Sequence, residues 1–265
     1  MGQYFMVINI DKKQKLRFLG ASKLGEFLFD GSPNELVGLL TETGAWNGDR
    51  VVCVGDYIGE DDLPPGCLTD AEEAEVKAAD SERRTLYHFA SKYYAAAPRG
   101  WHGLDLNTTY VLRNLTKHEY VLEGVVCRYE MSTRGYFGQV GLGEVLLARI
   151  SWSSDPSVSM FYNDLFYEKN KAEEDRTKHE GIHRGVWAGD RFDIIPIDEM
   201  EHLDGFAEWK DVSDEVDKEI DEIWTCQCGD EYTKELARTI MKHGFENIQA
   251  YLVHAHDLRK TRLRS

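Results

Sequence analysis

The chain repeats a short residue pattern at two distant places, and this internal repeat constrains its fold more than any other feature. Trp46-Asn47-Gly48-Asp49-Arg50 precedes an apolar run at 51–54, and Trp187-Ala188-Gly189-Asp190-Arg191 precedes a second run at 192–195. Two further matches come earlier in each copy and in the same order, 5–12 with 110–117 and 24–26 with 142–144. Collinear matches of this kind indicate duplication of one structural unit.

Local signals predict the same order of elements in each copy. Residues 4–10 are β-prone and lead through a polar turn to an apolar segment at 16–19, which predicts a hairpin. Ser32-Pro33 with Glu35 predicts a helix start, and the run after Asn47-Gly48 predicts a strand. We therefore expect an α+β fold in which two pseudo-symmetric hairpin–helix–strand repeats surround a shared sheet, with bridging and C-terminal helices beside them.

Four parts are expected within one compact body. The first repeat unit covers 1–60, and an acidic loop with a bridging helix covers 61–107. This helix is predicted to open at the Thr69–Glu72 capping box and to end at Ala97, before Pro98. The second repeat unit covers 108–198, and an acidic segment with C-terminal helices, the first capped by Ser213, covers 199–265.

The second copy is longer than the first. Matched positions are 16 and 21 residues apart in the first copy but 29 and 44 apart in the second, which predicts insertions of 13 and 23 residues. Insertions fall in surface loops, where binding and catalytic residues are commonly placed on a scaffold.

Composition excludes several classes of protein. Thirty-one basic residues against 47 acidic ones give a net charge of −16, which argues against non-specific nucleic-acid binding and is compatible with cationic partners. No stretch approaches the roughly 20 apolar residues of a membrane helix, and the N-terminal charge order is the reverse of a signal peptide. The five scattered cysteines favour a reducing, cytoplasmic setting over a disulfide scaffold.

The repeated Trp-x-Gly-Asp-Arg element is interpreted as structural. Residues that both copies retain are those that both copies need for folding. The tryptophans can fill a core, the glycines can take backbone angles that other residues resist, and the Asp-Arg pairs can stabilise a turn. The predicted structural residues are Trp46, Gly48, Asp49, Arg50, Trp187, Gly189, Asp190 and Arg191.

The string His179-Glu180-Gly181-Ile182-His183 has the H-E-x-x-H pattern and lies in the longer insertion. On a helix, His179 and His183 would lie one turn apart and could share a Zn²⁺, with Glu180 as general base. Against this, Gly181 weakens a helix, and no third ligand is apparent, although Glu199, Glu201 or His202 could be reached. A solvent-exposed helix end is the simpler interpretation. Cys226 and Cys228 alone make a poor zinc site, because their spacing is short and a second pair is lacking.

Two further segments could contact a ligand. Trp101, His102 and Asp105 lie among glycines at the junction between the repeats, and Trp152 and Asp155 lie in a Ser-rich stretch. These side chains could line a cleft between the two halves. The simpler alternatives are a packed linker with an exposed histidine at 99–105 and a capped turn at 151–156.

The opening Met1-Gly2-Gln3-Tyr4, the Asn9-x-Asp11-Lys12 turn, the first Trp-x-Gly-Asp-Arg element and Gly55-Asp56-Tyr57 resemble a family of uncharacterised fungal and bacterial proteins. The resemblance covers mainly the first 60 residues and, through the repeat, parts of 108–195. It implies a soluble stand-alone domain and transfers no catalytic residue.

The function expected from these features is that of a cytosolic binding or interaction protein. Its cleft between two repeats would take a small polar ligand or a protein partner. The alternative is a zinc-dependent hydrolase that uses His179, Glu180 and His183. A third possibility is a metal-free enzyme built around His102 and Asp105.

Overall fold

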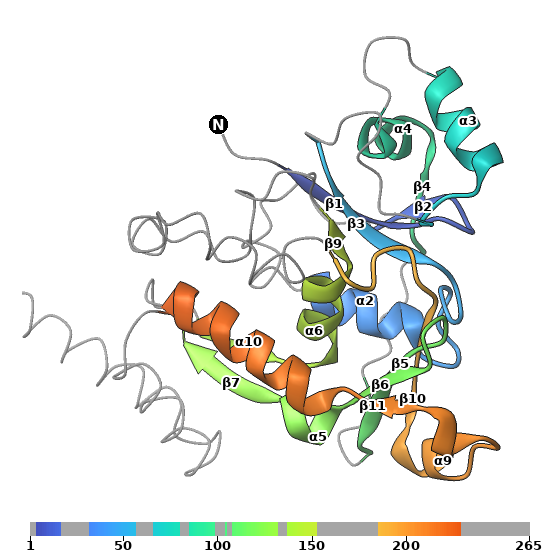
Figure 1. The fold of residues 1–265 in the computed structure, drawn as a ribbon. Helices are drawn as coiled ribbons and strands as arrows, with labels where there is room; N and C mark the ends of the chain where they lie inside the picture. Colours follow the sequence, from blue (N-terminus) through green and yellow to red (C-terminus); the bar gives the residue numbers. More distant parts are fainter. Residues whose placement is uncertain are drawn as a thin grey trace, which may run out of the picture.

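The computed structural model describes residues 4–16, 32–56, 66–79, 85–98, 104, 108–131, 137–152 and 185–228. Helices and mixed sheets alternate along these residues, so the predicted α+β class is confirmed (Figure 1). Within this part of the chain, no helix has both the length and the apolar composition needed to cross a bilayer.

The first sheet has the strand order β4-β2-β1-β3-β9. Its centre is antiparallel, and both edge strands, β4 and β9, pair in parallel. The predicted hairpin is present, and its second strand covers 14–15, directly after the turn; residues 17–19 of the predicted segment lie outside the described residues. The bounds are β1 (Phe5–Asn9), β2 (Gln14–Lys15), β3 (Val51–Gly55), β4 (Ala95–Ala96) and β9 (Ser151–Trp152).

The second sheet has the order β10-β5-β6-β11, and β7 pairs with β8 separately. The expectation of one shared sheet is therefore wrong. Gly48 and Gly189, with φ of 74° and 80°, turn the chain just before β3 and β10. The copies meet where β9 of the second unit pairs with β3 of the first, and at two isolated bridges, Thr41–Ile194 and Arg50–Arg191. The bounds are β5 (Tyr110–Asn114), β6 (Glu119–Leu122), β7 (Arg128–Met131), β8 (Phe137–Val140), β10 (Phe192–Pro196) and β11 (Lys210–Asp211).

Two helices, α2 (Ser32–Leu40) and α6 (Leu142–Ile150), lie in the middle of the molecule between the two sheets (Figure 1). The predicted helix start at Ser32-Pro33 is confirmed. The helices approach so closely that a Cβ atom on Gly143 would lie 2.3 Å from the Pro33 carbonyl oxygen. Glycine at this position therefore sets the distance between the two helices.

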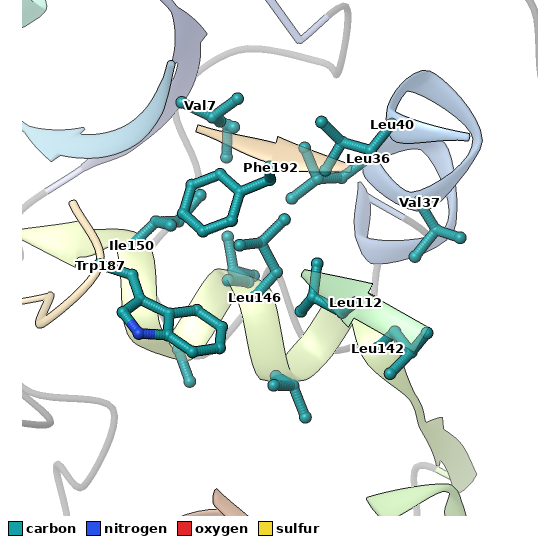
Figure 2. Packing of buried hydrophobic residues seen from close by; sticks show 14 of the residues in the cluster. Val7, Leu36, Val37, Leu40, Leu112, Leu142, Leu146, Ile150, Trp187 and Phe192 are labelled. Atoms are coloured by element: carbon teal, nitrogen blue, oxygen red, sulfur yellow. The ribbon is translucent and has the colours of Figure 1, made fainter. Parts of the chain in front are cut away.

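The central core forms where one face of each sheet meets these helices (Figure 2). Strand residues alternate between this core and an outer face; Phe5 and Val7 of β1 point inward, whereas Ile8 packs outward. Because both faces are covered, the strands read as continuous apolar runs. The central residues include Val7, Leu36, Leu40, Leu112, Leu146, Ile150, Trp46, Trp187 and Phe192.

The outer face of the first sheet is covered by α3 (Asp70–Ala79) and α4 (Leu86–Tyr93). The Thr69–Glu72 capping box is confirmed, with Thr69 N–H donating to Glu72 Oε2 at 2.8 Å and Glu72 N–H to Thr69 Oγ1 at 3.3 Å. The prediction of one helix from there to Ala97 is wrong. Thr85 caps α4 as a separate helix, and the chain leaves α4 in an extended conformation to form β4.

The acidic segment covers the outer face of the second sheet. Its apolar residues Met200, Phe206 and Trp209 pack against the sheet, while its carboxylates face outward. It contains α9 (Ile197–Glu201), the 3₁₀ turn η2 (Phe206–Glu208) and β11. The segment is therefore part of the fold, and it takes on the second sheet the place that α3 and α4 take on the first.

The last described helix is α10 (Ser213–Cys228), which lies beside α6 and the short α5 (Glu123–Val126). Val216 and Ile220 are buried, as the apolar spacing predicts. The Ser213 hydroxyl, expected to cap this helix, accepts a hydrogen bond from Leu122 N–H at 2.8 Å and so ties α10 to β6. The rest of the predicted C-terminal helices, after residue 228, lies outside the described residues.

Candidate functional site

Each copy of the repeat is closed by the same polar contacts. In the first copy, buried Asn9 donates to Asp49 Oδ2 at 2.8 Å and accepts from Lys12 N–H at 2.8 Å. Lys12 Nζ pairs with Asp49 at 2.7 Å and also donates to the Ala45 carbonyl. This network fastens the β1–β2 turn to the segment that enters β3.

The second copy makes the equivalent network. Asn114, also fully buried, donates to Asp190 Oδ2 at 2.8 Å and accepts from Lys117 N–H at 3.0 Å. Lys117 Nζ lies 3.2 Å from Asp190 and donates to the Val186 carbonyl. The sequence matches at 5–12 with 110–117 and at the two Trp-x-Gly-Asp-Arg elements therefore extend to the hydrogen bonds that join them. The duplication itself stays a prediction.

The repeated tryptophans are fully buried and each donates its indole N–H at 2.7 Å, Trp46 to Gln14 and Trp187 to Glu119. Backbone bonds then cross between the copies. Gly48 N–H donates to the Phe192 carbonyl at 2.8 Å, and Gly189 N–H donates to the Val51 carbonyl at 3.0 Å. In the described part of the chain, the junction between the repeats is thus packed and hydrogen-bonded.

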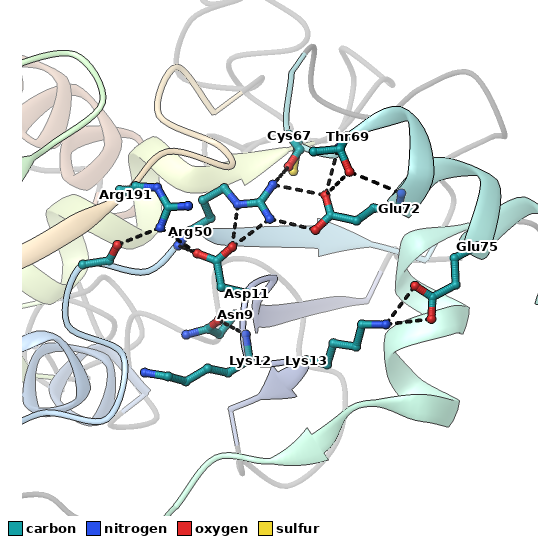
Figure 3. Close-up of polar contacts among 11 residues, drawn as sticks. Asn9, Asp11, Lys12, Lys13, Arg50, Cys67, Thr69, Glu72, Glu75 and Arg191 are labelled. Atoms are coloured by element: carbon teal, nitrogen blue, oxygen red, sulfur yellow. Dashed lines mark hydrogen bonds and ion pairs between the residues drawn. The ribbon is translucent and has the colours of Figure 1, made fainter.

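The two repeated arginines converge on one carboxylate at this junction (Figure 3). Arg50 bonds Asp11 through Nε at 2.8 Å and Glu72 through Nη2 at 2.7 Å. Arg191 reaches Asp11 Oδ2 from the other copy at 2.8 Å and also bonds the Gly48 carbonyl. Asp11 has no acidic counterpart in the second copy, where Thr116 Oγ1 accepts the Arg191 N–H.

The charges in this cluster stabilise one another's ionised forms. The hydrogen bond from Arg50 lowers the pKa of Glu72 to about 2, and the same pair raises the pKa of Arg50. Burial acts to raise the pKa of Asp11, but the hydrogen bonds and charges of Arg50 and Arg191 outweigh it, so this pKa is lowered. A cluster so paired is suited to holding segments together, which agrees with the structural interpretation of the repeated element.

The described cysteines are poorly suited to nucleophilic chemistry. Cys53 and Cys67 are free thiols. Burial raises the pKa of both Cys53 and Cys67 to about 12, so neither supplies a thiolate at neutral pH. Among the residues that the structure describes, no three His, Cys, Asp or Glu side chains are grouped closely enough to hold a metal ion.

Most of the predicted ligand and metal residues lie outside the described ranges. These are Trp101, His102, Asp105, Asp155, His179, Glu180 and His183. Trp152 is described: it ends β9 opposite Val54 and packs partly buried against the outer cluster of the first sheet. Leu104, within the same junction, packs against the central core.

The ends of the longer connection are held side by side. Trp187 N–H donates to the Arg149 carbonyl at 2.9 Å, and a Cβ on Gly185 would lie 2.7 Å from the Ser151 carbonyl oxygen. The first copy makes the matching bond from Trp46 N–H to the Leu39 carbonyl at 2.7 Å. The bonded residues are seven positions apart in the first copy and 38 in the second, so the second connection is 31 residues longer.

This count differs from the 23 residues obtained by matching 24–26 to 142–144. The hydrogen bonds pair α6 with α2, which begins at Ser32, so 31 of the extra residues lie after Arg149 and only five lie before it, since Asn9 to Leu39 spans 30 residues and Asn114 to Arg149 spans 35. Residues 24–26 lie outside the described ranges.

Two buried charged residues of α6 were not identified from the sequence. Glu144 is 6% exposed, its Oε2 accepts Gly141 N–H at 2.9 Å, and burial raises its pKa to about 7. Arg149 is 5% exposed and pairs with two glutamates of α10. Their presence within the apolar string LGEVLLARI was a usable signal, because charged residues are rarely buried without a specific partner.

Comparison with protein families, with curated proteins and with solved structures finds no match to this chain.

Proposed function

We propose that this chain is a cytoplasmic binding or interaction protein in which a paired-unit body presents a ligand-binding segment. The observation that carries the proposal is the longer second connection, whose two ends are fixed to each other at Ser151, Gly185 and Trp187. An insertion joined at one narrow base leaves the hydrophobic core of its scaffold undisturbed. Functional residues are commonly grafted onto folds in this way.

The proposed ligand-contacting residues are Trp101, His102, Asp105, Trp152 and Asp155, and the ligand is a small polar molecule or a protein partner. The net charge of −16 favours a neutral or cationic partner over nucleic acid. The free thiols of Cys53 and Cys67 support a reducing compartment. The repeated Trp-x-Gly-Asp-Arg elements would act as the frame, because their side chains are occupied by contacts within the body.

Affinity capture from an extract of the source organism, followed by mass spectrometry, tests the binding proposal. Wild type is compared with His102→Ala and Asp155→Ala, and Glu199→Gln on exposed α9 is the control. We expect a molecule that is retained by wild type and control and lost by at least one alanine variant. Identical retention by all four folded proteins would refute the assignment of these residues.

The alternative function is that of a zinc-dependent hydrolase, favoured by the position of His179-Glu180-x-x-His183 within the same connection. Elemental analysis of the purified protein and of His183→Ala separates the two. Stoichiometric zinc that is lost in the variant would support the hydrolase. Zinc absent from wild type, or unchanged in the variant, would eliminate it.

A further inference from the structure

Helix α10 has a charge distribution that opposes its docking on the body. Its described side chains include Asp214, Glu215, Asp217 and Glu219 but one lysine, Lys218. Glu215 and Glu219 are four residues apart, a spacing at which like charges repel on a helix. Its apolar attachment rests on Val212, Val216 and Ile220, which are buried at intervals of four residues. Docking therefore requires a compensating cation on the body.

Arg149 of α6 supplies this cation. Its Nη1 lies 3.0 Å from Glu219 Oε2, and its Nη2 lies 3.1 Å from Glu215 Oε1. The guanidinium carbon lies 4.5 Å from the centroid of the Trp187 ring. Trp187 is fully buried, so this face of Arg149 is covered by the ring and not by water. Arg149 Nε is buried with no hydrogen-bond partner among the described residues. The cation is thus desolvated, and the carboxylates of α10 neutralise it.

This cation is specific to the copy that carries α10. The carbonyl that receives the repeated tryptophan N–H belongs to Leu39 in the first copy and to Arg149 in the second. Similarly, the acceptor of the indole N–H is Gln14 in the first copy and Glu119 in the second. Lys210 Nζ, beside the start of α10, lies 3.7 Å from Glu119 and 3.9 Å from Glu215. Arg149 and Glu119, the two charged residues that are specific to the second copy, are therefore linked to each other through Glu215 of α10 and Lys210.

We propose that α10 is a detachable strap that Arg149 holds to the body, and that it opens locally and with dependence on salt before the two sheets unfold. Its carboxylates are accessible to counterions, because the Glu215 side chain is 51% exposed and that of Glu219 is 22% exposed. Opening would hydrate Arg149 and uncover the face of Trp187 at the base of the longer connection. Detachment of α10 is argued from contacts of described residues alone, and it does not require the ligand-binding function proposed above.

Amide hydrogen exchange of the full chain, at 0.02 M and 1 M NaCl, tests this proposal. In wild type we expect the 216–220 amides to exchange faster than those of β1, β3, β5 and β10, and faster still at high salt. In the double variant Glu215→Gln/Glu219→Gln, which keeps the body unchanged, exchange at 216–220 should rise by about tenfold or more at low salt and lose most of its salt dependence. Glu199→Gln/Glu201→Gln removes the same charge from exposed positions of α9 and should leave α10 unchanged.

Two results would overturn the proposal. One is unchanged exchange at 216–220 in the double variant, which would mean that Arg149 does not hold the helix. The other is an equal increase in α10 and in the central strands, which would make α10 an inseparable part of the fold. Arg149→Gln provides an independent second variant, with the same expected local increase at 216–220.

Discussion

Replacement of Glu144 by glutamine gives a quantitative test of the buried face of α6. Glu144 stands at the third position of the helix, where its carboxylate accepts Gly141 N–H at 2.9 Å. Gly141 offers no side chain to cap the helix, so Glu144 has this role alone. Because it is 6% exposed, burial disfavours its charged form and raises its pKa to about 7 from 4.5.

The sign of the pH dependence follows from proton binding. Below pH 4.5, folded and unfolded chains both carry a protonated Glu144. Between pH 4.5 and about 7, the unfolded chain loses this proton while the folded chain keeps it, so stability falls as pH rises. Above pH 7 the loss is complete. The difference between a pKa of 4.5 and one of about 7 corresponds to about 3–4 kcal/mol, because each pKa unit is worth about 1.4 kcal/mol.

Glutamine keeps the shape and the acceptor oxygen but cannot ionise. Glu144→Gln should therefore match wild type near pH 4 and exceed it by about 3–4 kcal/mol at pH 8. Urea unfolding at half-unit pH steps gives the free energy of unfolding of both proteins, and their difference removes the pH dependence that they share. Glu199→Gln, at an exposed site of α9, should change stability by less than about 0.5 kcal/mol at each pH. A flat difference for Glu144→Gln, or a wild type that gains stability over it as pH rises, would refute the reasoning.

Two further pairs of variants test the frame. Gly143→Ala should destabilise by about 1–3 kcal/mol, because its Cβ would lie 2.3 Å from the Pro33 oxygen, whereas Gly124→Ala in α5 meets nothing within 4 Å and should be neutral or stabilising in urea unfolding. Equal effects would contradict the close contact of α2 with α6. Glu72→Gln should cost about 1–2 kcal/mol at pH 7, and this cost should shrink as pH falls from 4.5 toward 2, because the lowered pKa of Glu72 stabilises the fold only while the carboxyl is ionised. Glu75→Gln on the same helix is the control, since its pair with Lys13 is about half exposed and should contribute less than about 0.5 kcal/mol. A cost of Glu72→Gln that does not change with pH would show that the charge of Glu72 is not the cause.

The parts of the fold that the sequence predicts well are those governed by local chemistry. The Ser32-Pro33 start of α2 and the Thr69–Glu72 capping box depend on residues within one helical turn of each other. The β1–β2 hairpin likewise depends on a short polar turn, which Asn9 closes with its own side chain. Such contacts depend on neighbouring residues alone, so they can be predicted without knowledge of the tertiary structure.

The parts of the fold that the sequence predicts wrongly, or does not predict, depend on tertiary contacts. The helix expected through Ala97 is not continuous, because Thr85 caps α4 as a new helix. After α4, residues Ala95–Ala96 are extended and pair with β2. The single shared sheet is absent because the helices α2 and α6 pack between the strands of the two copies, which meet through the β3–β9 pair and two isolated bridges. Arg149 and Glu144 are invisible to apolar periodicity, since their partners lie on α10 and on the helix N-terminus. The role of the acidic segment also emerges only when its apolar residues are placed on the second sheet.

We propose that the paired units form a self-sufficient body and that the longer second connection is grafted onto it. Replacing residues 153–184 by two glycines tests this directly, because Ser151 and Gly185 already lie in contact and the short link resembles the connection of the first copy. The measurement is the thermal unfolding of this variant against wild type. We expect a single cooperative transition within about 5 °C of wild type, because Ser151 and Gly185 already lie in contact and the short link closes a small loop. A variant that is unfolded, or that melts without cooperativity, would contradict it.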